Sequence, residues 1–387
     1  MSEARVNNLS NESNTGGPTI SGITTFSGTN YFVPPVGNTG QRPENPQKGS
    51  LRFNTDTAHL EYFKGDTIGW TEVEASNDEL NGGHRGMLIG GNSTPNYGGD
   101  TEYLTISTLG SSATFGNMAN TASAAAACGS RVRWVNAGGN EPGNPSANYI
   151  SYHVFASLGD SADFGDLSVG RWGLGGLSSQ TRGVFTGGSS SGDENNGTNT
   201  IDYITIASTG NAKDFGDMNT SGVYESGCAS STRGVIQVGK AGASPSTTNS
   251  NIMEYVTIAS TGNSSDFGDA TGAIASRHAC SNSTRGVVAG GSPGYSNVIE
   301  YITIASLGNA TNFGDLTQAR IWCAAVSSPT RAVWSGGYRS SPSAGFDTTQ
   351  DYVEIMTTGN ALDFGDVAIT SHTYQIAATS NGHGGFG

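Results

Sequence analysis

Tyr301-Ile-Thr-Ile-Ala-Ser-Leu-Gly-Asn-Ala-Thr-Asn-Phe-Gly-Asp315 is one of six similar stretches in this chain of 387 residues. In every stretch a tyrosine stands 12 residues before the phenylalanine of a Phe-Gly pair, and successive phenylalanines are 46 to 52 residues apart. The tyrosines are Tyr103, Tyr152, Tyr203, Tyr255, Tyr301 and Tyr352, and the phenylalanines are Phe115, Phe164, Phe215, Phe267, Phe313 and Phe364. The alternation of β-branched and polar residues after each tyrosine predicts a strand. A fixed period of this length is typical of repeat proteins, so we expect one β-unit to be repeated along most of the chain.

An arginine marks a second position in every repeat, five and six residues before a Gly-Gly pair that is degraded to Val238-Gly239 in one copy. These arginines are Arg85, Arg133, Arg182, Arg233, Arg285 and Arg331. The distance from each phenylalanine to the next arginine is always 18 residues, whereas the distance from arginine to tyrosine varies from 16 to 22. All length variation therefore lies between the Gly-Gly pair and the tyrosine, as expected for insertions on one face of a repeat protein.

Each repeat contains four runs of strand-like sequence. In the fifth repeat they are Ile274–Ser281, Arg285–Gly291, Ile299–Ser306 and Ala310–Leu316. Four antiparallel strands in about 50 residues form the blade of a β-propeller. The order resembles that of the kelch repeat, whose second strand ends in Gly-Gly. It departs from kelch in the fourth strand, where Asp-Phe-Gly-Asp stands in place of the tryptophan usual in that family.

The two ends of the repeat region complement each other. Residues 75–83, before Arg85, do not resemble a first strand, but His372–Thr379 follows Phe364 at the same offset as Ile321–Ser328 follows Phe313. We therefore expect the C-terminal strand to complete the blade that begins at Arg85, because such closure removes the open edges of a sheet. The prediction is an all-β chain with a closed six-bladed β-propeller over residues 81–387.

The repeated side chains are expected to be structural. We expect the phenylalanines and tyrosines to pack between blades. The arginines are expected either to pair with the aspartates after Phe-Gly or to clamp backbone carbonyls, and an alternative is a central ring of arginines that binds an anion. Those aspartates are Asp166, Asp217, Asp269, Asp315 and Asp366. The four cysteines, Cys128, Cys228, Cys280 and Cys323, fall in predicted first strands of separate blades, so we expect buried free thiols rather than disulfides.

Composition excludes several function classes. The 58 glycines, about 15% of the chain, are roughly twice the usual share, and no collagen period accompanies them. With a net charge of −14, the chain is a poor partner for nucleic acid, which needs clustered cations. No apolar run approaches the ~20 residues of a membrane span. There is no His-x-x-x-His or Cys-x-x-Cys spacing and no nucleophile elbow, so we expect no metal, no cofactor and no enzymatic activity.

The variable segments are the predicted recognition sites. They are polar, rich in Pro, Ser and Asn, and contain the single aromatics Tyr97, Tyr295, Tyr338 and Phe346. Loops on a rigid scaffold commonly carry binding functions. Exposed aromatics among small polar residues suit stacking on sugars or contact with a protein; the alternative is that these segments are tolerated insertions without a ligand.

Residues 1–80 lie outside the repeat. Gly49–Thr57, Leu60–Phe63 and Trp70–Val73 are predicted to form short strands. This module resembles one found in tail-fibre and other virion proteins of bacteriophages, especially those of marine bacteria, and the stretch from Arg5 to Pro35 is also similar to such proteins. The repeat Tyr-Ile-Thr-Ile-Ala-Ser-Thr-Gly-Asn with Asp-Phe-Gly-Asp is similar to propeller repeats of the same group.

The resemblance implies a protein on the surface of a virion. Residues 1–80 would attach it to other virion proteins, and the propeller would bind the host surface, with glycan as the expected ligand and an oligomeric state in the particle. Two alternatives remain: a capsid decoration or spike protein that contacts only other virion proteins, and a virion enzyme that cleaves polysaccharide.

Overall fold

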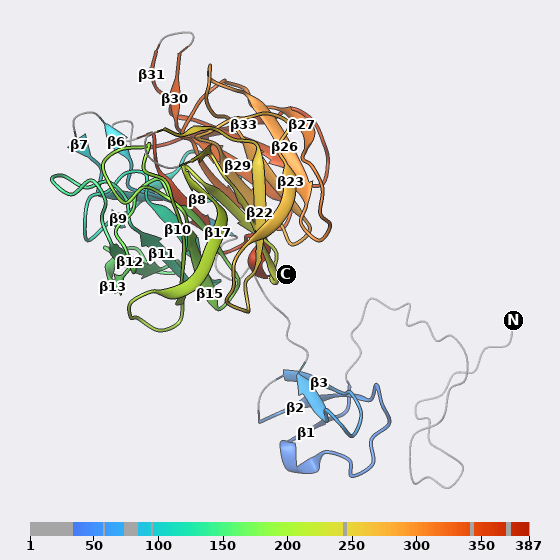
Figure 1. Ribbon diagram of the computed structural model, residues 1–387. Coiled ribbons are helices and arrows are strands. Elements are labelled where there is room, and N and C mark those ends of the chain that lie inside the picture. Colours follow the sequence, from blue (N-terminus) through green and yellow to red (C-terminus); the bar gives the residue numbers. More distant parts are fainter. Residues whose placement is uncertain are drawn as a thin grey trace, which may run out of the picture. The chain divides into compact units, whose positions relative to one another are not determined.

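The computed structural model describes residues 34–56, 59–72, 84–93, 96–242, 246–340, 344–368 and 373–386 (Figure 1). The chain is all-β, with 50% of its residues in strands and 2% in helices. It divides into two compact units, Met1–Asn77 and Asp78–Gly387. The boundary expected at residue 80 falls in the stretch 73–83, outside the described residues, as do residues 1–33 of the expected attachment segment.

The first unit contains one small sheet whose strands lie in chain order. They are β1 (Val36–Gly37), β2 (Leu51–Asn54), β3 (His59–Phe63) and β4 (Trp70–Glu72), with the short helix η1 (Thr39–Gln41) after β1. The carboxylate of Glu61 is fully buried and lies 2.6 Å from Arg42 Nη2 and 3.5 Å from Arg52 Nε. The hydrogen bond from Arg42 holds the pKa of Glu61 below its usual range, so the carboxylate stays charged inside the sheet.

In the described part of the second unit, six antiparallel sheets each contain four strands of the repeat. Sheet 1 contains β34 (Ala377–Ser380), β5 (Arg85–Ile89), β8 (Asp100–Thr105) and β9 (Ala113–Asn117). Sheet 2 contains β10 (Ala126–Gly129), β11 (Arg133–Ala137), β12 (Tyr149–Val154) and β13 (Ala162–Asp166). Sheet 3 contains β14 (Gly175–Ser178), β15 (Arg182–Thr186), β16 (Thr198–Thr205) and β17 (Lys213–Val223), extended by β20 (Lys240–Ala241) and β21 (Thr248–Asn249).

The remaining sheets repeat the same order. Sheet 4 contains β18 (Ser226–Ala229), β19 (Arg233–Gln237), β22 (Ile252–Thr257) and β23 (Ser265–Asp269). Sheet 5 contains β24 (His278–Ser281), β25 (Arg285–Ala289), β26 (Val298–Thr303) and β27 (Thr311–Asp315). Sheet 6 contains β28 (Ala324–Ser327), β29 (Arg331–Ser335), β32 (Thr349–Glu354) and β33 (Leu362–Asp366). Two hairpins, β6 (Asn92–Ser93) with β7 (Asn96–Tyr97) and β30 (Tyr338–Arg339) with β31 (Gly345–Phe346), stand apart from these sheets.

The sheets follow one another in a closed, propeller-like order. Each first strand contacts the first strands of both neighbouring sheets, and β28 of sheet 6 contacts β34 of sheet 1. As expected, the C-terminal strand pairs with the strand that begins at Arg85, with Ala377 opposite Ile89. Of the predicted C-terminal strand His372–Thr379, the first residue, His372, lies outside the described residues.

Neighbouring sheets interlock through the Phe-Gly motif. The carbonyl of Phe313 in sheet 5 accepts a hydrogen bond of 2.9 Å from the backbone N–H of Gly359, in the last hairpin of sheet 6. The N–H of Asp315 donates to Asn360 Oδ1 at 3.1 Å. The same hydrogen bond recurs in the other sheets. The carbonyls of Phe115, Phe164, Phe215, Phe267 and Phe364 accept from the N–H groups of Gly159, Gly210, Gly262, Gly308 and Gly110 respectively. The last of these joins sheet 6 to sheet 1, so the interlock closes on itself.

The marker aromatics lie in the packing between strands. All six marker phenylalanines are buried, and each forms an edge-to-face pair with the tyrosine 12 residues before it, with ring centroids 5.7 to 6.3 Å apart. The tyrosines are half-buried. Such pairs stabilise beyond the apolar area that they bury, by about 1 kcal/mol each.

The marker arginines clamp carbonyls of the next sheet. The guanidinium of Arg285 lies over the ring of Tyr301 in its own sheet, 4.2 Å from the centroid, and its Nη1 donates to the carbonyl of Ile355 in sheet 6 at 2.9 Å. The same bond joins Arg85, Arg133, Arg182, Arg233 and Arg331 to the carbonyls of Phe155, Ile206, Ile258, Ile304 and Ile106.

Of the two structural roles expected for these arginines, the carbonyl clamp is confirmed and the ion pair with the aspartates after Phe-Gly is wrong, as is the central arginine ring. The guanidinium groups are engaged by carbonyls and tyrosine rings, while the backbones of those aspartates face the hairpin of the next sheet. The arginines begin the second strands, whereas the first strands surround the centre.

Small and hydroxylated residues line the centre. The hydroxyls of Ser178, Ser281, Ser327 and Ser380 each donate to a carbonyl of the preceding sheet, at 2.6 to 2.9 Å. The four cysteines are free and buried, as expected, although Cys323 directly precedes β28 rather than lying in it. Burial raises the pKa of Cys228 to about 12 and that of Cys323 to about 11, so these thiols are unreactive in the folded protein.

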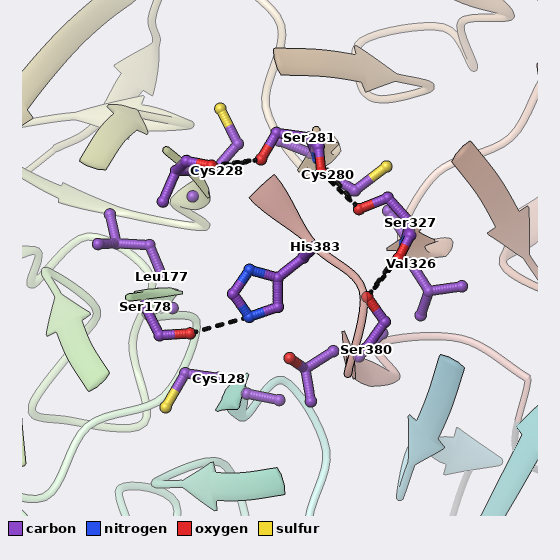
Figure 2. Close-up of a pocket in the computed structure, with 18 residues that line it drawn as sticks. Cys128, Leu177, Ser178, Cys228, Cys280, Ser281, Val326, Ser327, Ser380 and His383 are labelled. Atoms are coloured by element: carbon purple, nitrogen blue, oxygen red, sulfur yellow. Dashed lines mark hydrogen bonds between the residues drawn. The ribbon is translucent and has the colours of Figure 1, made fainter. Parts of the chain in front are cut away.

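The C-terminal residues form a plug at one end of this centre. His383 precedes the short helix η2 (Gly384–Phe386), and Figure 2 shows its imidazole among the first-strand residues. Its Nδ1 accepts a hydrogen bond from the N–H of Gly385, so Nε2 carries the proton and donates to the carbonyl of Gly129 at 3.2 Å. A Cβ on Gly385 would lie 1.9 Å from the carbonyl oxygen of Ser178, so only glycine fits there.

The plug should make the protein sensitive to acid. Burial lowers the pKa of His383 to about 4, and burial has the same effect on His278. Because the folded pKa lies below the unfolded value of about 6.5, this contribution to stability is complete above pH 6.5 and is lost as the pH falls towards 4. The loss should reach about 3 kcal/mol for His383 alone.

Urea unfolding at pH 7 and pH 4.5 measures this loss. His383→Gln should remove its share of the difference between the two pH values and leave the share of His278. An identical pH dependence in the wild type and in this variant would contradict the assignment.

Candidate functional site

The second unit has two ends of different character. Strand β5 begins next to His84 and leads through Gly90-Gly91 to Asn92, which bridges to Tyr374. His84 and His383 line one cavity of about 140 Å³ at the first of these ends, which we call the terminal end. The opposite end, the loop end, carries the hairpins β6–β7 and β30–β31, drawn at the upper left and at the top of the second unit in Figure 1.

The backbones of six residues surround the central axis of the second unit at the loop end. Ala124, Gly173, Tyr224, Ser276, Trp322 and Gln375 each precede a first strand, one per sheet, and all have positive φ, between +49° and +64°. Backbone hydrogen bonds join neighbours around the ring, from Ala124 N to Gln375 O at 2.9 Å and from Gly173 N to Ala124 O at 2.7 Å. The cavity below them has a volume of about 30 Å³, enough for a water molecule. A larger ligand must therefore rest on the surface of this end.

Seven aromatic side chains form one connected cluster at the loop end. The aromatic cluster consists of Trp172, Tyr224, Tyr295, Trp322, Tyr338, Phe346 and Tyr374. Its centre is Tyr374, whose ring is 5.4 Å from Phe346, 5.5 Å from Trp322 and 6.0 Å from Tyr338. Phe346 is 38% exposed. Trp172 is buried and the other five rings are half-buried, so the cluster is accessible from the surface only in part.

Three of the four predicted binding residues lie in this cluster. Tyr338 and Phe346 face each other across the hairpin β30–β31, and Tyr295 stacks on Tyr338 with centroids 6.3 Å apart. Tyr97 lies on β7, and none of the ring contacts found among the described residues includes it. The loops of sheets 5 and 6 therefore converge.

Four members of the cluster were not predicted from the sequence. Trp172, Tyr224, Trp322 and Tyr374 come from the segments before first strands, eight to ten residues after a marker phenylalanine. An aromatic recurs there in four of the six repeats, which is the signal that could have found them. It is weak because the other two repeats have no aromatic there, with Ser-Ala-Ala at 123–125 and Ala-Ser-Arg at 275–277.

Polar side chains border the cluster through Tyr224. Its hydroxyl donates to Glu194 Oε2 at 3.2 Å, and Lys240 Nζ lies 2.6 Å from Glu194 Oε1. Burial, followed by the negative charge of Glu194, raises the pKa of Tyr224, so the hydroxyl remains a donor. On the other side of the cluster, Arg339 Nη1 lies 3.5 Å from Asp347 Oδ1. These charges are paired, so the margin of the cluster is polar without a strong field of one sign.

In the part of the chain that the structure describes, no group of three or more His, Cys, Asp or Glu side chains could hold a metal ion. No helix among these residues is long and apolar enough to cross a membrane. Neither a known protein family nor a curated protein matches this sequence.

Proposed function

We propose that this protein binds glycan at the loop end without catalysis, as a component of a phage virion. The single observation that carries the binding function is the aromatic cluster. Aromatic rings present flat apolar faces with polar tips, which suits the alternating C–H and hydroxyl surfaces of a sugar. Tyr224 and Trp322 belong to the ring of backbones around the axis, and Trp172 and Tyr374 adjoin it, so these four side chains are already positioned for a ligand.

We also propose that the second unit is a six-bladed β-propeller that supports this surface. The closed order of first-strand contacts, the interlocked Phe-Gly motifs and the pairing of β34 with β5 support it. A propeller is a rigid scaffold, and loops that such a scaffold positions at one end commonly carry binding residues.

The virion location rests on the likeness of the repeat and of residues 1–80 to marine phage proteins. One feature of the second unit is consistent with it. The described part of this unit begins at His84, at the terminal end, and the cluster lies at the other end. Attachment to a particle through residues 1–80 would leave the cluster accessible to a cell surface. Immunogold labelling of intact phage particles tests this location.

Binding is tested with Trp322→Ala and Tyr374→Ala. The probe is a polysaccharide that retards the wild type in affinity electrophoresis. Each variant should bind this polysaccharide about 30-fold more weakly, because a central interface aromatic contributes about 2 kcal/mol. Trp70→Ala is the control, since it removes a half-buried aromatic from the other unit.

Two results would refute the glycan function. One is retardation by none of the neutral or anionic polysaccharides tried. The other is equal retardation of the wild type and both cluster variants, which would favour a protein that contacts only other virion proteins.

A further inference from the structure

Glu194 and Lys240 form a joined acceptor and donor at the edge of the aromatic cluster. Glu194 lies in the variable loop of sheet 3, and Lys240 lies on β20, in the variable segment after β19 of sheet 4. Their side chains are 41% and 21% exposed. Tyr224 connects them to the cluster, since its ring contacts Trp172 at 5.5 Å and Lys240 Nζ lies 5.7 Å from its centroid.

Both groups keep bonding capacity for a ligand. A carboxylate can accept about four hydrogen bonds, and an ammonium can donate three. Glu194 accepts one from Tyr224 and one from Lys240, which leaves lone pairs on the carboxylate and N–H groups on the ammonium. Since both side chains are partly exposed, a ligand seated on the cluster can reach them.

The loop that carries Glu194 is braced. The hydroxyl of Ser189 donates to the carbonyl of Asp193 at 2.6 Å, and the N–H of Asn195 donates to Asp193 Oδ1 at 2.9 Å. Thr247, in the segment of sheet 4, donates to the carbonyl of Glu194 at 3.4 Å. Loops from two sheets thus hold the pair in place, which lowers the entropy cost of using it for binding.

We propose that Glu194 and Lys240 select neutral sugars with vicinal hydroxyls, a specificity that rests on the proposed glycan function. One hydroxyl of such a diol donates to the Glu194 carboxylate, and its neighbour accepts from the Lys240 ammonium. Glu194 neutralises Lys240, so the pair offers no net positive charge to a sulfate or uronate and repels it through the carboxylate. The sugar ring stacks on the aromatic cluster, while Glu194 and Lys240 form hydrogen bonds with the hydroxyls at its edge.

The test uses the full-length protein in affinity electrophoresis through gels that contain dextran, whose 1,6-linked glucose units carry vicinal hydroxyls, as the neutral probe and alginate or carrageenan as anionic probes. We expect retardation by the neutral probe. Glu194→Ala and Lys240→Ala should each weaken it about 10-fold, which corresponds to 1.4 kcal/mol. Glu354→Ala is the matched control, because Glu354 also forms a surface ion pair. Glu354 ends β32, and its carboxylate lies 3.1 Å from the guanidinium of Arg331, which begins β29 away from the cluster.

The outcomes separate the two proposals. If the Trp322 variant loses retardation while both pair variants keep it, glycan binding stands and the selection by Glu194 and Lys240 is refuted. Retardation by anionic probes alone also refutes the selection. If the cluster variants bind as the wild type does, the glycan function itself fails. Circular dichroism of the pair variants identifies any loss due to misfolding, and Glu194→Gln, which keeps the shape, should still weaken binding.

Discussion

A chain that ends at Gln375 should fail to form the native second unit. The truncation removes β34, so the buried edge of β5 at Met87, Leu88 and Ile89 loses its partner strand. Strands β10 and β28 also lose their shared neighbour, and the ring of sheets opens. An exposed apolar strand edge favours association with other chains, so we expect aggregation or a loosely packed state.

Near-ultraviolet circular dichroism and size-exclusion chromatography measure this loss of structure. A chain that ends at Gly382 is the matched control, because it keeps β34 and removes only the plug that contains His383. It should fold, with lower stability than the full chain. A truncation at Gln375 that unfolds at the same urea concentration as this control would show that closure contributes little.

Gly314→Ala should destabilise the protein far more than Gly359→Ala, although both glycines have a φ of +157°. A Cβ on Gly314 would lie 2.2 Å from the carbonyl oxygen of Gly359 in the next sheet, whereas a Cβ on Gly359 would have no atom within 4 Å. Both variants bear the strain of an L-residue at positive φ, about 1 kcal/mol. Only Gly314→Ala also forces two backbones apart, which should cost about 2 to 3 kcal/mol more.

The difference between these two variants in urea unfolding isolates the contact between sheets. Because the backbone strain is matched, it cancels in the comparison. Equal midpoints for the two variants would mean that neighbouring sheets can separate there at little cost, contrary to the interlock described above.

The sequence predicted the strands well because the repeat shows each element six times. In the fifth repeat, the predicted strand Arg285–Gly291 corresponds to β25 (Arg285–Ala289). The predicted first strand Ile274–Ser281 is too long, since β24 begins only at His278. The left-handed backbone of Ser276, with φ of +58°, interrupts the strand, and a serine carries no signal for that conformation.

The sequence left two kinds of partner open for the marker arginines, aspartates and backbone carbonyls, and could not decide between them. A carbonyl acceptor such as that of Ile355 belongs to the backbone, so its side chain gives no indication of the bond. The aspartates after Phe-Gly were expected as partners only because their charge is opposite to that of arginine. A different acidic position went unnoticed: the residue before the marker tyrosine is acidic in five of six repeats, and Asp202, Glu300 and Asp351 there bind the buried arginines Arg171, Arg277 and Arg320 at 2.7 to 2.9 Å.

The aromatic cluster was predicted only in part because it exists only after the sheets assemble. Tyr338 and Phe346 lie in one variable segment and were visible as a pair. Trp172 and Tyr374 are about 200 residues apart, and only the closed order of the sheets brings their segments to one end. Tyr97 shows the converse, since an aromatic in a variable segment need not join the cluster.

The pairing of β34 with β5 also governs how the protein is made. Strand β5 leaves the ribosome about 290 residues before β34 is synthesised. At 5 to 20 residues per second, its apolar edge waits roughly 15 to 60 s for its partner. During this interval the five completed sheets can pack in order, but sheet 1 cannot. The nascent chain is therefore most vulnerable to association with its neighbours on a polysome at Met87–Ile89, and a chaperone that covers this one segment would protect this strand edge until β34 has been synthesised.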